Sequence, residues 1–382
     1  MNLPPELIDQ ILDDLSDDLE SLRAAALVSK AWASWCQAHL FKSVHLTPHT
    51  LNGWFKNVPH EVGGPASLTR TLTLEESYFM SWINPQFMYF PLSNLTTFSD
   101  VRSLSFIKWD AILFRGASLK PYFGHFGTTL RAVSLRSCGF HPAILFDLLS
   151  LLPNVDDLEI ERPHTHSKVP DTIPDAPKIT PSFRGTLSLA DLSAGTLILK
   201  AIATLPLHFS TIKINGCLLY ELGAYQMLLT SCRDTLVTLH LEESNRGLTL
   251  PDVSLASCNE LEEVHALFLG FMKLPRSPGT PFSSITSRKL RKISLTFAED
   301  GNPHYQNEPG WDESEWSVWG ARPIPWGSWD TVLSHLAHQA RGAGGRLTLQ
   351  LNVRRVGPKP PKLDHLLPRF LGDGGLVDIN CN

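Results

Sequence analysis

The chain has 382 residues, of which 43% are hydrophobic and 19% charged, so it is long enough for two or three domains with a substantial core. A formal net charge of -5 at pH 7 is too small to indicate nucleic-acid binding. No apolar run approaches the roughly 18 residues that span a bilayer, and the N-terminal segment is too acidic for a signal peptide. We therefore expect an intracellular protein, in the cytoplasm, the nucleus or both. Its six cysteines, which form no CxxC pair, should then be reduced.

Residues 1–46 predict a small helical module with two competing apolar faces. Pro4 and the proline after it suit a first helical turn, where a missing N–H costs nothing. In the helix that follows, one row at four-residue spacing contains Leu7 and Ile11, and a second row contains Ile8 and Leu12. One row can face inward, and the other needs a partner.

A second helix is expected from Asp17, because Glu20 three residues later completes a capping box. Its apolar stripe continues to Trp32, whereas Leu27 and Val28 fall outside the stripe. A core of this size rarely stabilises a unit by more than ~3–5 kcal/mol. We therefore expect another protein to cover the remaining apolar side chains.

The pattern LPPELIDQIL, a short acidic connection, LRAAALVSKAW and a closing HLF together resemble the F-box. The F-box is the adaptor-binding module of substrate receptors in cullin–RING ubiquitin ligases, and the resemblance covers Leu3 to about Phe41. It implies contact with a Skp-type adaptor, and through the adaptor with a cullin scaffold. The adaptor-binding positions that it implies are Leu3, Pro4, Ile8, Leu12, Leu27, Val28 and Trp32. The alternative is an ordinary helical cap on the rest of the chain.

A linker is expected at residues 47–66, with a short helix at Pro48–Pro59 and then a loop. Beyond it, in residues 67–382, short alternating apolar segments recur. They occupy 72–74, 104–106, 133–135, 158–160, 187–189, 212–214, 239–241, 264–266, 293–295 and 349–351. Successive segments lie 25 to 32 residues apart, and the last interval, 56, is twice 28. The spacing indicates a repeat.

Each repeat is predicted to be a short strand followed by a helix, as at His141–Pro153, Ala224–Leu236 and Trp329–Ala340. Parallel stacking of such strands pairs their backbone groups and buries the leucines. The copies at Leu130–Phe140 and Phe209–Leu219 complete LxxLxLxxCxL and resemble the degenerate leucine-rich repeats that follow the F-box in many fungal receptors. The fold class is therefore α/β, with an N-terminal F-box-like helical module and an irregular leucine-rich-repeat-like solenoid of parallel strands and helices.

Cys138 and Cys217 occupy the cysteine slot of this pattern, which predicts buried and chemically inert thiols. The strand residues that alternate with the core should line a shared surface. They are Thr73, Ser105, Ser134, Glu159, Ser188, Lys213, His240, His265, Ser294 and Thr348.

Loop insertions are expected at 161–182 and 299–328, and a shorter interruption at Phe271–Ser284. The second insertion carries Trp311, Trp316 and Trp319 beside acidic residues, a composition typical of binding hot spots. These three tryptophans are the candidate substrate-binding residues. Alternatively, they seal the end of the repeat array.

Catalytic signatures are missing from the sequence, which has no GxSxG, GxxxxGK[ST] or HExxH motif. His164 with His166, and His335 with His338, have spacings that metals can use, but no Cys pair or carboxylate pair accompanies either in sequence. We expect no metal, no cofactor and no catalytic residue. An enzyme whose site is assembled from distant residues remains a weaker option.

The sequence thus predicts a non-catalytic substrate-recognition subunit of a cullin–RING ubiquitin ligase. It would bind a Skp-type adaptor through the N-terminal helices and a protein substrate through the solenoid. The alternative is a leucine-rich-repeat interaction scaffold with no link to a ligase.

Overall fold

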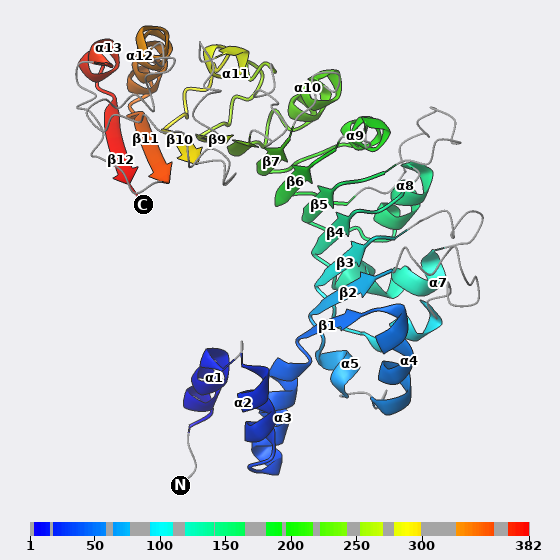
Figure 1. The fold of residues 1–382 in the computed structure, drawn as a ribbon. Helices are drawn as coiled ribbons and strands as arrows, with labels where there is room; N and C mark the ends of the chain where they lie inside the picture. Colours follow the sequence, from blue (N-terminus) through cyan, green and yellow to red (C-terminus); the bar gives the residue numbers. More distant parts are fainter. Residues whose placement is uncertain are drawn as a thin grey trace, which may run out of the picture. The chain divides into compact units, whose positions relative to one another are not determined.

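The chain consists of two compact units, Met1–Ser182 and Phe183–Asn382. In each unit, short parallel strands alternate with helices (Figure 1). The fold class is therefore α/β, as predicted. The computed structural model describes residues 4–15, 18–58, 64–76, 92–109, 119–140, 142–164, 181–192, 196–216, 222–242, 253–269, 279–298, 326–354 and 366–381.

The first unit begins with three helices, α1 (Pro5–Asp14), α2 (Leu19–Ala26) and α3 (Lys30–Leu40). Its strands are β1 (Ser43–Leu46), β2 (Thr71–Glu75), β3 (Ser103–Ile107), β4 (Ala132–Arg136) and β5 (Asp157–Glu161). Between the strands lie α4 (Pro48–Asn57), α5 (Pro65–Leu68), the 3-10 helix η2 (Leu92–Thr97), α7 (Lys120–Phe123), the 3-10 helix η4 (Gly124–Thr128) and α8 (Pro142–Ser150). Each strand pairs in parallel with the next, with Val44, Leu72, Leu104, Val133 and Leu158 in register.

The strands of the second unit are β6 (Thr186–Ala190), β7 (Thr211–Asn215), β8 (Thr238–Glu242), β9 (Glu263–Leu269), β10 (Lys292–Ala298), β11 (Thr348–Arg354) and β12 (Leu376–Cys381). Its helices are α9 (Thr196–Ala203), α10 (Leu222–Ser231), α11 (Gly279–Ser283), α12 (Trp326–Gly342) and α13 (Pro368–Gly372). The parallel ladder again follows chain order, and the helices lie on one side of the strands (Figure 1).

Alternation of buried and open residues explains why these short segments form strands. In β3, Leu104 and Phe106 are buried while Ser105 between them is partly exposed. The ladder is continued just ahead of β1 to β4 and β6 to β9, where one carbonyl accepts two backbone N–H groups. The carbonyl of Arg70, for example, accepts from Arg102 at 2.8 Å and Ser103 at 3.0 Å. Stacking therefore satisfies backbone groups that a five-residue strand could not satisfy alone.

All ten apolar segments predicted from the sequence lie within strands, β2 to β11. The sequence analysis missed β1 and β12. Strand β1 falls inside the range 1–46 that was assigned to the helical module, yet it pairs with β2. Strand β12 carries the same alternation, with Val377 and Ile379 in register with Leu349 and Leu351, but the sequence analysis did not include this segment.

The predicted helices of the array correspond to α8, α10 and α12, and the linker helix corresponds to α4. Helix α12 begins at Trp326, so the predicted insertion 299–328 is wrong in its last three residues. The interruption at Phe271–Ser284 contains α11. The remaining insertion residues, 165–180 and 299–325, lie outside the described residues.

A buried carboxylate joins the last two helices. Asp330 on α12 accepts the backbone N–H groups of Phe370 at 2.9 Å and Arg369 at 3.2 Å, at the start of α13. Because α13 has no capping side chain of its own, Asp330 supplies partners for two N–H groups that would otherwise be unpaired.

Candidate functional site

The three N-terminal helices are set by their caps. Pro4 precedes α1, with Pro5 at its first position. Helix α2 is capped by Asp18, whose carboxylate accepts from the Ser21 hydroxyl at 2.6 Å and from the backbone N–H groups of Ser21 and Glu20 at 3.1 Å. These hydrogen bonds lower the pKa of Asp18, and the bond from the Ser21 hydroxyl has the largest effect.

The single helix expected after the acidic connection is in fact two helices. Helix α2 ends at Ala26, and Ser29 caps α3 by accepting the N–H of Trp32 at 3.2 Å. The break comes after three consecutive alanines, where the next residues, Leu27 and Val28, have no core to pack into. The resulting corner projects both side chains outward.

The core of this module is small. It consists of Ile8 and Leu12 from α1, Leu22 from α2 and Cys36 from α3, all buried. Partly buried side chains surround it, namely Leu15, Ala25, Ala26, Trp32, Trp35 and Leu40. Of the two apolar rows on α1, the row of Ile8 and Leu12 therefore faces inward.

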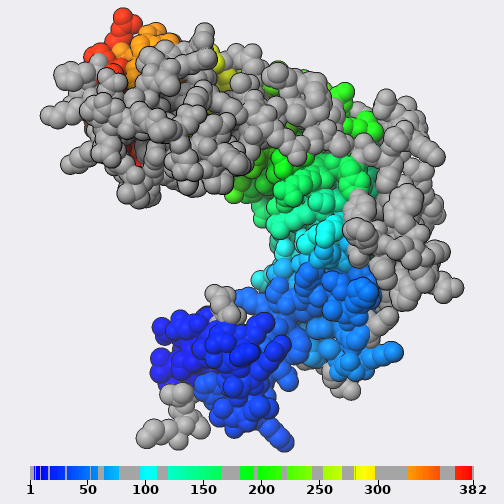
Figure 2. Space-filling model, in the orientation of Figure 1, coloured from blue at the N-terminus to red at the C-terminus, as the bar shows by residue number. Residues whose placement is uncertain are grey.

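The other apolar row and the corner after α2 remain at the surface. Leu27 is 88% exposed and Val28 is 70% exposed, values that are unusual for aliphatic side chains in a folded chain. On α1, Leu7 is 47% exposed and Ile11 is 38% exposed. We call these four residues the exposed apolar set. Their module forms one end of the first unit, in dark blue in Figure 2.

The predicted adaptor-binding residues thus separate into groups. Leu27, Val28 and Pro4 are exposed, and Trp32 is half-buried against the module core. Ile8 and Leu12 are enclosed by their own module and have almost no surface to offer. Leu3 lies outside the described residues, as do the candidate substrate-binding residues Trp311, Trp316 and Trp319.

Leu7 and Ile11 were not among the predicted contact residues, although their four-residue spacing was visible in the sequence. The spacing shows that two rows exist, but only the packing of α1 on α2 and α3 shows which row is covered. Leu7 and Ile11 therefore belong to the exposed apolar set, and Ile8 and Leu12 belong to the module core.

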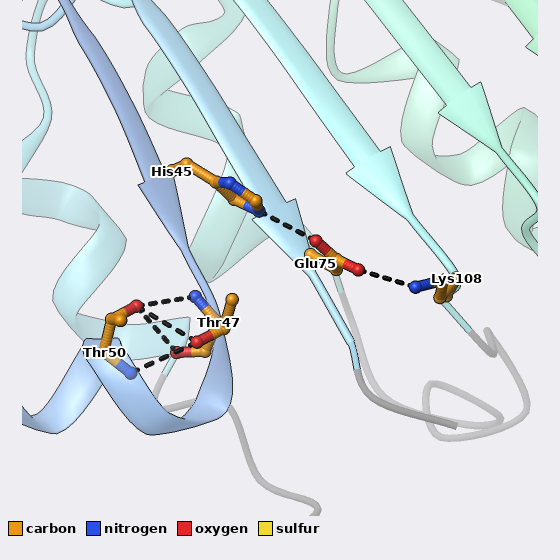
Figure 3. A network of polar contacts seen from close by, with 5 residues as sticks. All are labelled: His45, Thr47, Thr50, Glu75 and Lys108. Carbon is orange, nitrogen blue, oxygen red and sulfur yellow. Dashed lines mark hydrogen bonds and ion pairs between the residues drawn. The ribbon is translucent and has the colours of Figure 1, made fainter. Parts of the chain in front are cut away.

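The strand face of the first unit carries charged pairs that cross between strands. Glu75 at the end of β2 pairs with His45 on β1, 3.0 Å from Nε2 to Oε2, and with Lys108 after β3, 2.7 Å from Nζ to Oε1 (Figure 3). The hydrogen bond from Lys108 is the main cause that lowers the pKa of Glu75. Both oxygens of Glu75 are engaged, so this network positions side chains along the strand ends.

A second charged pair continues this row. Arg136 at the end of β4 donates from one nitrogen to both carboxylate oxygens of Glu159 on β5, at 3.0 and 3.1 Å, and lies 3.8 Å from Glu161. The side chains are partly exposed, so each pair contributes no more than ~1 kcal/mol to stability. The charged side chains of these two networks thus pair with one another across neighbouring strands.

The shared row predicted for the strand residues is confirmed within each unit. Thr73, Ser105, Ser134 and Glu159 are in register across β2 to β5. In the second unit the row runs through Ser188, Lys213, His240, His265 and Ser294. Thr348 lies on the same face but in the adjacent row, paired with Lys292, and the residue of β11 opposite Ser294 is Gln350.

Cys138 is buried, and its Sγ donates to the carbonyls of Phe106 and Arg136 at 3.3 Å. Burial is the main cause that raises the pKa of this thiol to about 12. The structural role predicted for Cys138 therefore fits its position, whereas Cys217 lies outside the described residues.

Neither metal-binding nor membrane-spanning features occur in the described part of the chain. No three His, Cys, Asp or Glu side chains come together there in a group able to hold a metal ion. His335 contacts Gln339 at 2.9 Å on α12, and His166 is outside the described residues. None of the described helices combines the length and hydropathy that a membrane crossing requires.

The fold defines an α/β protein of stacked parallel strands with helices along one side, and a helical N-terminal module. The sequence matches no family model and no curated protein. Its function is therefore inferred from the residues themselves.

Proposed function

We propose that the chain is a substrate-recognition subunit of a cullin–RING ubiquitin ligase. Its N-terminal helices, with the F-box-like pattern, would dock on a Skp-type adaptor that joins it to a cullin. The strands and helices that follow would act as a leucine-rich-repeat-like solenoid that binds the protein substrate. The chain would act inside the cell, in the cytoplasm or nucleus.

The observation that carries the proposal is the exposed apolar set on an otherwise well-formed module. Leu27 and Val28 are exposed and do not belong to the module core. Leu7 and Ile11 form the exposed row of α1. Keeping such side chains in water costs free energy that burial against a partner recovers, at roughly 25 cal/mol per Å². Leu27 and Val28 are also two of the positions at which the F-box resemblance implies adaptor contact.

The mechanism would be proximity alone. A receptor of this kind holds its substrate beside the ligase's catalytic subunits, so that a second-order encounter becomes effectively intramolecular. Neither a catalytic residue nor a cofactor on this chain is needed for that role.

Co-purification tests the proposal. The full chain is mixed with a fungal Skp-type adaptor, alone and with a cullin, and an established F-box protein serves as positive control. The matched variants are Leu27→Ala with Val28→Ala, and Met227→Ala, which removes an exposed apolar side chain from α10 in the second unit. We expect the wild type and Met227→Ala to retain the adaptor and the double variant to lose it. Failure of the wild type under conditions in which the positive control binds rejects the proposal.

The alternative, an interaction scaffold with no ligase link, is favoured by one observation. Helix α3 packs on α5, and Lys42 just after α3 accepts the N–H groups of Arg70 and Thr71 at 2.9 Å, so the helices are joined to the start of the first sheet as an end cap would be. On this reading the adaptor binds neither the wild type nor the double variant. Both would still capture a common partner through the strand face.

A further inference from the structure

The strand face of the second unit is a grid of polar side chains whose rows are fixed by the register. The middle row runs from His240 on β8 to His265 on β9, then to Ser294 on β10 and Gln350 on β11. Strands are spaced ~4.8 Å apart, so the two neighbours of Ser294 stand roughly 10 Å from each other.

Ser294 leaves a gap in this row because its side chain is short. It is 3% exposed and forms the floor of a pocket of about 370 Å³. His265 stands on one side of the pocket and Gln350 on the other, and Lys292 lies one pleat away on β10. A planar group with ~3.5–4 Å contacts on each side fits between the two walls. We call this pocket the β10 slot.

The histidine wall of the slot is preorganised. The rings of His240 and His265 stack with their centroids 4.4 Å apart and their planes 9° apart. Because one face of His265 lies against His240, its other face is turned toward β10. Burial is the main cause that lowers the pKa of both histidines, so both rings are neutral at pH 7. His265 Nε2 lies 3.2 Å from Glu263 Oε2, and since a carboxylate only accepts, Nε2 carries the proton.

The floor of the slot presents hydrogen-bond donors. The Asn352 side-chain amide donates to Ser294 Oγ at 2.9 Å and to Thr296 Oγ1 at 3.1 Å, while Asn380 donates to Asn352 Oδ1 at 3.2 Å. A hydroxyl that accepts a hydrogen bond keeps its own proton to donate. The hydroxyls of Ser294 and Thr296 therefore each keep a proton that a ligand in the slot can accept.

Two lysines near the slot carry positive charge that a ligand can pair with. Lys292 lines the slot, and Lys213 is in register with His240 on β7; neither forms an ion pair with a described residue. Two carboxylates stand near these lysines. Glu242 lines the slot and is engaged in an interaction of its own, and the carboxylate of Glu263 is engaged by His265 and by Arg291, which lies 3.6 Å away.

A second pocket of about 400 Å³ adjoins the slot, and Lys292 lines both. It is lined by the carboxylates of Asp378 and Glu263 and by the guanidinium groups of Arg346 and Arg291, and Arg291 is paired with Glu262 and Glu263. The hydroxyls of Ser294 and Thr296 and the unpaired ammonium of Lys292 favour an acceptor-rich, negatively charged ligand.

We propose that the β10 slot binds an oxyanion, a carboxylate or a phosphate, carried by an extended peptide segment of a partner protein. The oxyanion would accept from the Ser294 and Thr296 hydroxyls and pair with Lys292. The planar carboxylate, or one face of the phosphate, would lie between His265 and Gln350. This inference rests on the proposed function only in taking the strand face as the substrate-binding side. It uses no residue of the N-terminal helices, so it can fail or succeed independently of adaptor binding.

Three capped alanine pentapeptides test the slot, with a central glutamate, glutamine or phosphoserine. Their dissociation constants for the full chain are measured at low ionic strength, without adaptor. We expect an acidic peptide to bind at least about tenfold more tightly than the glutamine peptide, as charge-assisted hydrogen bonds predict. The ratio of the glutamate and phosphoserine peptides then identifies which oxyanion the slot prefers.

Variants locate the binding. Lys292→Met and Ser294→Ala should each weaken the preferred peptide about fivefold. Lys200→Met on α9 removes the same charge from an exposed position on a helix and should change binding less than twofold. Lys292 is partly exposed near the start of β10, so its variant stays informative even if Ser294→Ala disturbs folding. Equal binding of the glutamine peptide, no binding of any peptide, or equal losses in Lys292→Met and Lys200→Met would overturn the proposal.

Discussion

Replacing Leu12 by alanine should unfold the N-terminal module, whereas replacing Leu27 should not. Leu12 is fully buried in the four-residue core, and Leu-to-Ala changes at such sites cost ~2–5 kcal/mol. A helical unit this small rarely holds more than ~3–5 kcal/mol of its own. Leu27 is 88% exposed, and surface changes usually stay within ~0.5 kcal/mol.

Amide hydrogen exchange over residues 5–40 measures this difference directly, since a single melting temperature would average over two units. Leu12→Ala should accelerate exchange by roughly 30- to 4,000-fold, and Leu27→Ala by less than about threefold. Amides of β8 in the second unit serve as the internal reference and should not change. Equal protection in the two variants, or a larger loss in Leu27→Ala, would refute the assignment of inner and outer rows on α1.

Three further predictions concern buried polar groups. Asp330→Ala leaves two N–H groups of α13 unpaired and should cost ~1–3 kcal/mol, seen as faster exchange of the α13 amides; unchanged exchange would contradict the capping role. Burial raises the pKa of the Cys138 and Cys232 thiols to about 12, so iodoacetamide at about pH 8 should alkylate them only after denaturation, as mass spectrometry can show. Burial lowers the pKa of His240 from 6.5 to about 4, so between these values the unfolded chain binds a proton that the folded chain does not. Stability should fall as the pH drops through that window, and a folded-state ring titration by NMR near 6.5 would show the reasoning to be wrong.

The strands were predictable from sequence because each places apolar residues two apart, as Leu104 and Phe106 do, and because the segments recur at a nearly constant interval. Strand β12 was missed although Val377 and Ile379 have the same alternation at the same interval, because these two positions lack the leucines that mark most of the other strands. The break between α2 and α3 was not predicted because Leu27 and Val28 are apolar residues, which are common inside helices. Only Ser29, which caps α3, signals it.

The site was harder to predict than the fold. Ile8 with Leu12 and Leu7 with Ile11 have the same spacing, and sequence periodicity does not say which pair the neighbouring helices cover. The β10 slot depends on register across strands that are distant in sequence, such as Ser294 and Gln350. A one-residue shift in register would place different side chains beside Ser294 and remove the slot.

The dissociation constant between the full chain and a Skp-type adaptor tests the central claim most directly. Leu27→Ala and Val28→Ala together remove five methyl or methine carbons, most of whose surface is exposed in the free chain. If the adaptor buries these carbons, they contribute about 3 kcal/mol to the binding free energy. The double variant should therefore bind the adaptor about 200-fold more weakly than the wild type, with unchanged hydrogen exchange in α1 to α3. Absence of measurable adaptor binding by the wild type, or equal affinity of the two proteins, would contradict the proposed docking surface.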